Sequence, residues 1–296
     1  MAARVQGATD RTSRPARRTL ALLAGPAAVF LLLFMLVPLL SLVRTSLYDS
    51  DKSFGGAGWS LRHYVRFLGD GFYVSVLGQT LVYGLIVSLF CVLVGFPLGY
   101  SLARMSPSAR RWRIPMVILP LTLSLVVNVF GWLIILSRGG LVNKALLGLG
   151  LIDAPVQLLF SSFTVMLVMA QTFLPFMVLS IMSVVAQIDP ALEQAAANLR
   201  AGRWTTLRRV VLPLALPGIL AGSTLVFILT VSAFITPRLI GGTRVQMLGS
   251  MIYEQTLVVL NWPFGGAMSL ILLAIVFMFV AGVNRLSRTR FSETRN

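Results

Sequence analysis

The stretch Asp189-Pro-Ala-Leu-Glu-Gln-Ala-Ala-Ala-Asn-Leu-Arg-Ala-Gly-Arg-Trp-Thr-Thr-Leu-Arg-Arg-Val-Val-Leu-Pro213 is a polar, helix-forming segment between two long apolar runs. Asp189 can cap the N-terminus of a helix, Pro190 suits its first position, and Gly202 can end it. Apolar residues then recur at helical spacing from Trp204 to Val211. The pattern predicts two short amphipathic helices joined at Gly202, which either dock into a groove of a partner protein or lie on lipid headgroups.

The rest of the chain is too apolar for a soluble domain, since 57% of its 296 residues are hydrophobic and 11% are charged. Charged residues are absent from six windows, each long enough for the roughly 20 residues that cross a bilayer as a helix. We therefore predict an all-α membrane protein whose 188–212 loop joins the fourth and fifth of six transmembrane helices. The six spans are expected at 20–43, 74–102, 114–137, 161–187, 213–237 and 263–284. Glycines and a proline break up residues 138–160, which favours a short external helix and loop there.

Basic residues indicate how the chain is oriented. Seventeen of the 25 Lys and Arg residues fall in the two ends of the chain and in the segments around 104–113 and 200–209. By the positive-inside rule, both termini and the 188–212 loop lie in the cytoplasm. The domain layout is a basic tail (1–19), a transmembrane domain (20–284) and a second basic tail (285–296). The net charge of +16 reflects this topology and contact with membrane lipid, and does not indicate nucleic-acid binding.

Residue types that carry enzyme chemistry are scarce. Cys91, the only cysteine, lies within a predicted span, and His63, the only histidine, is expected on the external surface. The sequence has no Gly-x-x-x-x-Gly-Lys-Ser/Thr phosphate loop. A membrane enzyme would need a cluster of acids, bases or metal ligands near one face, so we expect no catalytic residue, cofactor or metal site in this chain.

The spacing of the 189–213 segment resembles the signature loop of ABC-importer permeases of the binding-protein-dependent superfamily. That pattern is Glu-Ala-Ala, three residues, Gly, nine residues, an aliphatic residue, one residue, and Leu-Pro. Here it falls on Gln194-Ala195-Ala196, Arg200, Val210 and Leu212-Pro213, so that Gln replaces the usual Glu and Arg the usual Gly. Glu193 and Gly202 are adjacent and could partly substitute. Because the usual contact and turn would be absent, positions 194 and 200 are expected to tolerate substitution.

Five further segments resemble the spermidine/putrescine-type import branch: 132–144, 174–177, 234–242, 249–254 and 261–265. The resemblance implies a permease subunit of the bacterial inner membrane that pairs with a second, unlike permease. Two cytoplasmic ATPases would drive the pair, and a periplasmic or tethered binding protein would deliver the solute. The ATPase-coupling loop would comprise Glu193, Gln194, Ala195, Ala196, Arg200, Gly202, Leu212 and Pro213.

Polar residues within the spans are the candidates for contact with a transported solute, because burying them in lipid is costly. No Asp, Glu, Lys or Arg occupies the middle of a predicted span. Asn128 and Gln171 are amides near mid-span, and Ser232 and Thr236 are one helical turn apart on one face of the fifth span. The alternative role for these residues is hydrogen bonding between helices. Similar permeases often have Asp, a carboxylate that would suit a polycation, where this chain has Asn261. The expected solute is therefore either a polyamine or another small organic molecule.

A second hypothesis is an autonomous secondary transporter or channel. Such a protein is expected to show an inverted repeat or intramembrane carboxylates that couple transport to an ion. Neither feature is evident in the sequence. Copurification of an ATPase through the 188–212 loop would distinguish the two hypotheses.

Overall fold

The computed structural model describes residues 13–50 and 58–292, and within them every regular element is helical. The longest helices are α1 (Ser13–Ser46), α3 (Gly71–Arg104), α7 (Ser162–Val185), α10 (Leu212–Val231) and α12 (Trp262–Ser292). A helix satisfies its own backbone hydrogen bonds, which lipid cannot do. The predicted all-α fold is confirmed.

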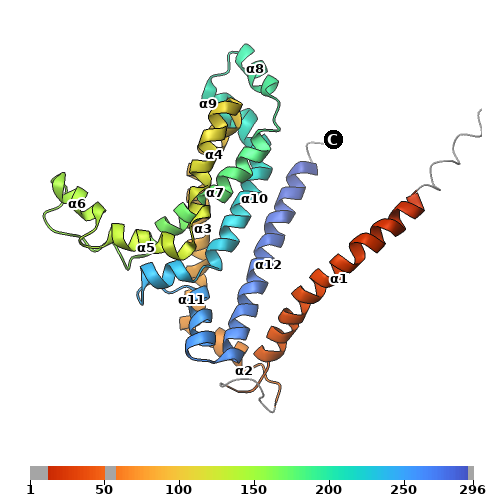
Figure 1. Cartoon of the computed structure of the whole chain (residues 1–296), viewed down its shortest axis with the longest axis vertical. Helices are drawn as coiled ribbons and strands as arrows, with labels where there is room; N and C mark the ends of the chain where they lie inside the picture. The colour runs from red at the N-terminus through yellow and green to blue at the C-terminus, as the bar shows by residue number, and fades with distance from the viewer. Residues whose placement is uncertain (1–12, 51–57, 293–296) are drawn as a thin grey trace, which may run out of the picture.

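Helices α3, α7 and α10 pack side by side and form the core of the bundle (Figure 1). Met177 and Ile181 of α7 are fully buried between them. Gly99 of α3 lets the backbones approach closely, because a Cβ atom there would lie 2.9 Å from the carbonyl oxygen of Val178. Small residues at such contacts are the usual means of helix association in membranes.

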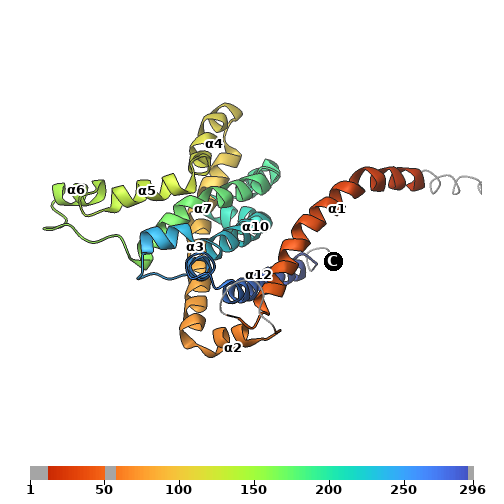
Figure 2. The same ribbon diagram turned by 60° about the horizontal axis from the view of Figure 1, so that its bottom comes forward.

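Helices α1 and α12 lie outside this core. Figures 1 and 2 show α1 diverging from α12 toward its N-terminus. Leu42 and Ser46 meet Gly266 of α12 near the other end of α1. Every side chain from Val29 to Val37 is at least 47% exposed. This apolar surface is therefore available to lipid or to another subunit.

Six stretches of the described chain are long and apolar enough to cross a membrane. Four of them agree closely with the predicted spans: Gly25–Ser46, Gly71–Arg104, Ser162–Val185 and Trp262–Val283. The sixth helix continues beyond the predicted end of the transmembrane domain at 284, as far as Ser292. Of the predicted tails, residues 1–12 and 293–296 lie outside the described residues.

The third predicted span, 114–137, is wrong as a single helix. It is divided between α4 (Pro107–Thr122) and α5 (Leu125–Leu136), because Leu123 is extended and Ser124 is not helical. The Thr122 hydroxyl bonds to the carbonyl oxygen of Leu119 at 2.8 Å, and such side-chain bonds compete with helix continuation. Figures 1 and 2 show α5 turning away from the direction of α4. The membrane-length stretch there is Leu125–Gly148, which includes α6 (Leu141–Gly148), so 138–160 does contain the expected short helix and loop.

The fifth span is shifted toward the N-terminus relative to the predicted 213–237. It begins with α9 (Arg203–Thr206) and η1 (Leu207–Val211), and continues into α10 without a break. Pro213 has no N–H to give to the preceding turn, and η1 is a single π-helical turn in which Leu212 N bonds to the carbonyl oxygen of Leu207. The second helix of the loop is therefore the first part of the membrane helix.

Short helices occupy both ends of the bundle. At one end α8 (Pro190–Asn198) precedes α9, and at the opposite end lie α2 (Arg62–Gly69) and α11 (Leu248–Tyr253) (Figure 1). The short helices η2 (Pro237–Gly241) and η3 (Glu254–Val258) flank α11 in the sequence. His63 of α2 is fully buried and its Nε2 lies 3.1 Å from the carbonyl oxygen of Tyr48, so its predicted surface position is wrong.

Candidate functional site

The first helix of the 189–213 segment has well-defined ends. Asp189 caps its N-terminus by accepting a hydrogen bond from Ala191 N at 2.9 Å, as predicted. At its C-terminus, Arg200 N donates to Ala197 O at 2.9 Å and Ala201 N donates to Ala196 O at 3.0 Å. This pair of bonds is a Schellman motif, and Arg200 is its left-handed residue, with φ of 58°.

Two predictions about the loop are therefore wrong. Gly202 does not end α8, because the helix has already ended at Asn198 and Gly202 precedes α9 in an extended conformation. The turn expected from the family's glycine is also retained at position 200. An L-residue with a side chain is strained there, because its Cβ crowds the neighbouring carbonyl. Arg200 thus keeps the turn at a cost in stability.

Apolar side chains are exposed on this polar end of the molecule. Leu192, Leu199 and Trp204 are 46%, 84% and 72% exposed, and no residue of α8 is buried. Ala196 lies on the same helical face as Leu192 and Leu199 by its spacing and is partly buried. We call Leu192, Ala196, Leu199 and Trp204 the loop patch. Exposed apolar patches rimmed by charged residues are typical of protein interaction sites.

Gln194, which stands where the family usually has Glu, is exposed, and so is Ala195 next to it. Farther along, Leu212 and Pro213 are exposed in the first turn of α10, which continues from η1. Of the predicted coupling residues, only Glu193 forms side-chain bonds to another membrane helix in the described structure.

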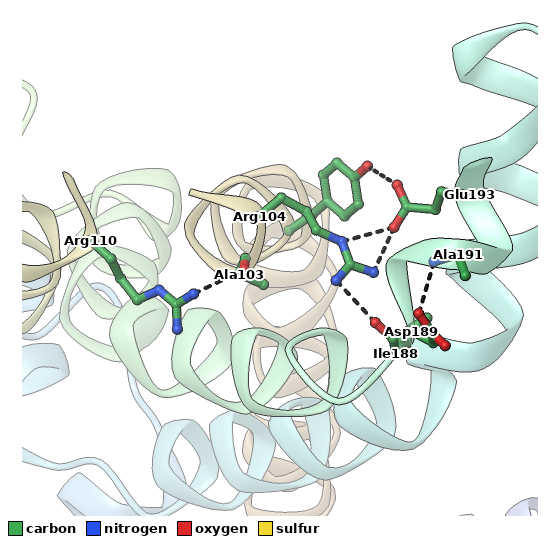
Figure 3. Close-up of polar contacts among 8 residues, drawn as sticks. Ala103, Arg104, Arg110, Ile188, Asp189, Ala191 and Glu193 are labelled. Atoms are coloured by element: carbon green, nitrogen blue, oxygen red, sulfur yellow. Dashed lines mark hydrogen bonds and ion pairs between the residues drawn. The ribbon is translucent and has the colours of Figure 1, made fainter. Parts of the chain in front are cut away.

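Glu193 points back to the end of α3 (Figure 3). Its Oε1 accepts from Nε of Arg104 at 2.8 Å and lies 2.6 Å from Nη2, while its Oε2 accepts from the Tyr100 hydroxyl at 2.7 Å. Arg104 Nη1 also donates to the carbonyl oxygen of Ile188 at 3.0 Å. Sequence reasoning missed Tyr100 and Arg104. Their i, i+4 spacing at the end of a span, opposite a loop with few acidic residues, was the available signal.

The structure brings together the two amides predicted to lie within the membrane. Asn128 Nδ2 of α5 lies 3.1 Å from Thr172 Oγ1 and 3.4 Å from Gln171 Oε1, both on α7. The indole N–H of Trp132 donates to the same Gln171 oxygen at 3.1 Å. Asn128 and Gln171 are only partly buried. This polar cluster therefore links two helices and still presents polar atoms at its surface.

Ser232 and Thr236 do not complete a polar track. Helix α10 ends at Val231, and Ala233 and Phe234 are not helical, so the two hydroxyls do not share one helix face. Ser232 is exposed, whereas Thr236 is 3% exposed. The prediction failed because it assumed a continuous span as far as residue 237.

A cavity of about 520 Å³ opens at the end of the bundle opposite α8. We call it the outer cavity. Its lining includes Phe72 and Tyr73 at the start of α3, Arg238 of η2, and Glu254 of η3. Arg238 Nη1 lies 3.3 Å from Glu254 Oε2. Sequence reasoning missed this cavity because its walls come from segments more than 150 residues apart.

Comparison with known proteins decides the family. Residues 95–291 match the family described as "Binding-protein-dependent transport system inner membrane component". The chain belongs to this family. It is a multi-pass membrane protein that serves as the permease subunit of an ABC importer, and it is not an enzyme. The hypothesis of an autonomous transporter is therefore set aside.

The permease has relatives of similar length. It is 34% identical over 260 residues to the spermidine/putrescine transport system permease protein PotB of Escherichia coli (strain K12), covering 88% of this chain and 94% of PotB. It is 32% identical over 224 residues to the inner membrane ABC transporter permease protein YdcU of the same strain, covering 72% and 71%.

Solved structures support the fold. A bacterial alginate ABC transporter in complex with an alginate pentasaccharide-bound periplasmic protein contains a chain that matches with a TM-score of 0.72 and 19% identity, over 93% of the permease and 96% of that chain. A chain of the inward-facing MetNI methionine ABC transporter matches with a TM-score of 0.56 and 18% identity, over 73% and 94%. The six-helix permease fold is thereby confirmed.

The left-handed conformation of Arg200 leads to a stability prediction. Arg200→Gly should relieve the backbone strain and stabilise the end of α8 by about 1 kcal/mol. Amide hydrogen exchange in α8 should slow accordingly. Ala197→Gly is the matched control, because residue 197 is helical and the same replacement there should destabilise α8 by about 1 kcal/mol. Faster exchange in Arg200→Gly would contradict the assignment of strain.

Proposed function

We propose that this permease and a second, unlike permease subunit form the membrane pathway for a polyamine-like or other small organic solute. An external binding protein would deliver the solute, and two separate ATPase subunits would drive transport. The observation that carries the solute class is the 34% identity to PotB over 88% of the chain. Separate ATPases are needed because the sequence contains no phosphate-binding loop of its own.

The proposed orientation places the loop patch in the cytoplasm and the outer cavity outside. It is supported by the 17 basic residues in the segments assigned to the cytoplasm. The position of α8 and the C-terminal end of α12 toward the same end of the bundle agrees with this orientation (Figure 1). The outer cavity would then face the binding protein.

Contact with the ATPase is assigned to the loop patch. Leu192, Leu199 and Trp204 expose apolar surface at an end of the molecule rich in arginine, where a partner protein rather than lipid hydrocarbon would cover them. Two short helices that present such residues match the helix-in-groove mode of recognition. Gln194 and Ala195 are exposed beside the patch and would also face the partner.

Solute contact is assigned to the cluster of Asn128 and Gln171, with Thr172 and Trp132 as its hydrogen-bond partners. An amide cluster can accept hydrogen bonds from ammonium or hydroxyl groups without holding a permanent charge in the membrane. Ser232 remains a candidate because it is exposed just after the end of α10, whereas Thr236 is buried and is no longer proposed. The outer cavity, with the carboxylate of Glu254, would receive the solute first.

The orientation predicts the location of reporters fused to the chain. Fusions at residues 108 and 200 should report from the cytoplasm, and fusions at 150 and 250 from outside, because basic segments resist translocation. Paired alkaline phosphatase and fluorescent-protein reporters measure this directly. A fusion at 200 that reports from outside would invert the permease and remove the docking proposal.

Docking predicts that a bulky charge within the loop patch blocks the ATPase. Ala196→Arg should reduce both solute uptake and copurification of the ATPase by about tenfold or more, because it overfills a closely fitted small-residue face. The permease itself should still insert and accumulate. Ser108→Arg is the control, since Ser108 is an exposed residue in the first turn of α4, outside the patch. Normal ATPase binding by Ala196→Arg would show that this face does not dock.

The solute assignment predicts a change in apparent affinity. In vesicles that contain the complete transporter, Asn128→Leu should raise the spermidine concentration for half-maximal uptake about two- to twelvefold, the effect of one lost hydrogen bond. Thr224→Val is the control, because within the described part of the chain the Thr224 hydroxyl bonds inside its own helix, to Leu220 O at 2.8 Å. An unchanged half-saturation with less assembled complex would show that Asn128 serves packing. No uptake of polyamine by the unaltered transporter would refute a polyamine as the solute.

A further inference from the structure

Helix α8 packs against α9 and η1 and is joined to α3 by polar contacts. None of its residues is buried. Among the described residues, the side-chain hydrogen bonds from α8 to another helix are made by Glu193, which bonds to Tyr100 and Arg104 of α3. We call Glu193, Arg104 and Tyr100 the clamp.

The clamp is well suited to hold a fixed geometry. Both carboxylate oxygens of Glu193 have partners, at 2.6 and 2.8 Å from Arg104 and 2.7 Å from Tyr100. The side chains of Arg104 and Glu193 are 19% and 20% exposed, so water and salt screen them less than a surface ion pair. Charge-assisted hydrogen bonds of this kind are about twice as strong as neutral ones.

Arg104 also contacts the backbone just before α8. Its Nη1 donates to the carbonyl oxygen of Ile188 at 3.0 Å, and Ile188 directly precedes the capping residue Asp189 (Figure 3). Arg104 is the last residue of α3, where a cation is favoured by the helix dipole. The clamp therefore joins the end of α3 to both the approach to α8 and its first turn.

Helix α3 connects the clamp to the outer cavity. Tyr100 and Arg104 lie in its last two turns, and Phe72 and Tyr73 at its start line the cavity. Its 34 residues span about 50 Å at the usual helical rise. The loop thus has three connections to the membrane bundle, since the chain joins it to α7 and to α10 and the clamp joins it to α3.

We infer that the clamp transmits displacement of the ATPase-bound loop to α3, and through α3 to the outer cavity. Without it, movement of the loop would reach α3 only indirectly, through α7 and α10, to which the chain joins the loop and which pack against α3. Arg104 and Tyr100 are then positioning residues for coupling, since they contact neither the ATPase nor the solute. The inference rests on the proposed docking of an ATPase at the loop patch.

The test follows the outer cavity in the complete transporter with its ATPases. Thr243 lines the cavity and is exposed. A fluorophore on Thr243→Cys, in a Cys91→Ser background, should change emission when ATP binds. Arg104→Gln should reduce that change about tenfold, a coupling energy within the range usual for linked sites. The ATPase should remain bound, and Arg104→Lys should restore part of the response.

Arg111→Gln is the matched control, because Arg111 lies in the same basic segment but is exposed on α4. It should leave the fluorescence response unchanged. Combining Arg104→Gln with Glu193→Gln should add little to either change alone, since both remove one interaction. A full response in Arg104→Gln, or loss of the ATPase from that complex, would overturn the inference. ATPase that stays bound to Ala196→Arg would instead refute the docking site, whatever the clamp does.

Discussion

A bilayer offers no water to the backbone, and this constraint determines most of the structure. Each membrane-spanning segment must satisfy its own N–H and C=O groups, so the apolar windows of the sequence become helices. Since lipid is as apolar as leucine, the helices associate through close packing rather than through the hydrophobic effect. Helices α3, α7 and α10 pack closely because Gly99 lies against Val178 and Gly222 lies against Met177, where a larger residue would clash. The elements at both ends of the bundle are positioned by this three-helix core.

The same constraint explains which features could be predicted from the sequence. Charge-free windows gave four of the six spans within a few residues, because the bilayer thickness sets their length. The absence of charged residues from a stretch of sequence does not show where a helix within that stretch is interrupted. The non-helical residues Leu123 and Ser124 divide the third span, and the end of α10 at Val231 separates Ser232 from Thr236. Both breaks depend on local hydrogen bonding and on the packing of neighbouring segments.

Some side-chain contacts could be predicted from the sequence and others could not, depending on how unusual each residue is at its place in the membrane. Asn128 and Gln171 were identified because a polar residue in a membrane is conspicuous, and the structure joins them. Tyr100 and Arg104 were overlooked because a tyrosine and an arginine at a membrane boundary are common there. His63 was misplaced because sequence position alone cannot show that the His63 face of α2 packs against Phe264. At position 200 an arginine replaces the family's usual glycine, but the left-handed turn at the end of α8 is retained.

The capped and clamped state of α8 also bears on assembly. Asp189 fixes one end of the helix, the Schellman turn fixes the other, and Glu193 sets its position relative to α3. These contacts all lie within the permease itself. A loop of this kind is folded before any partner arrives, so little conformational entropy remains to be lost on association. Its encounter with a partner would resemble rigid-body docking rather than coupled folding and binding.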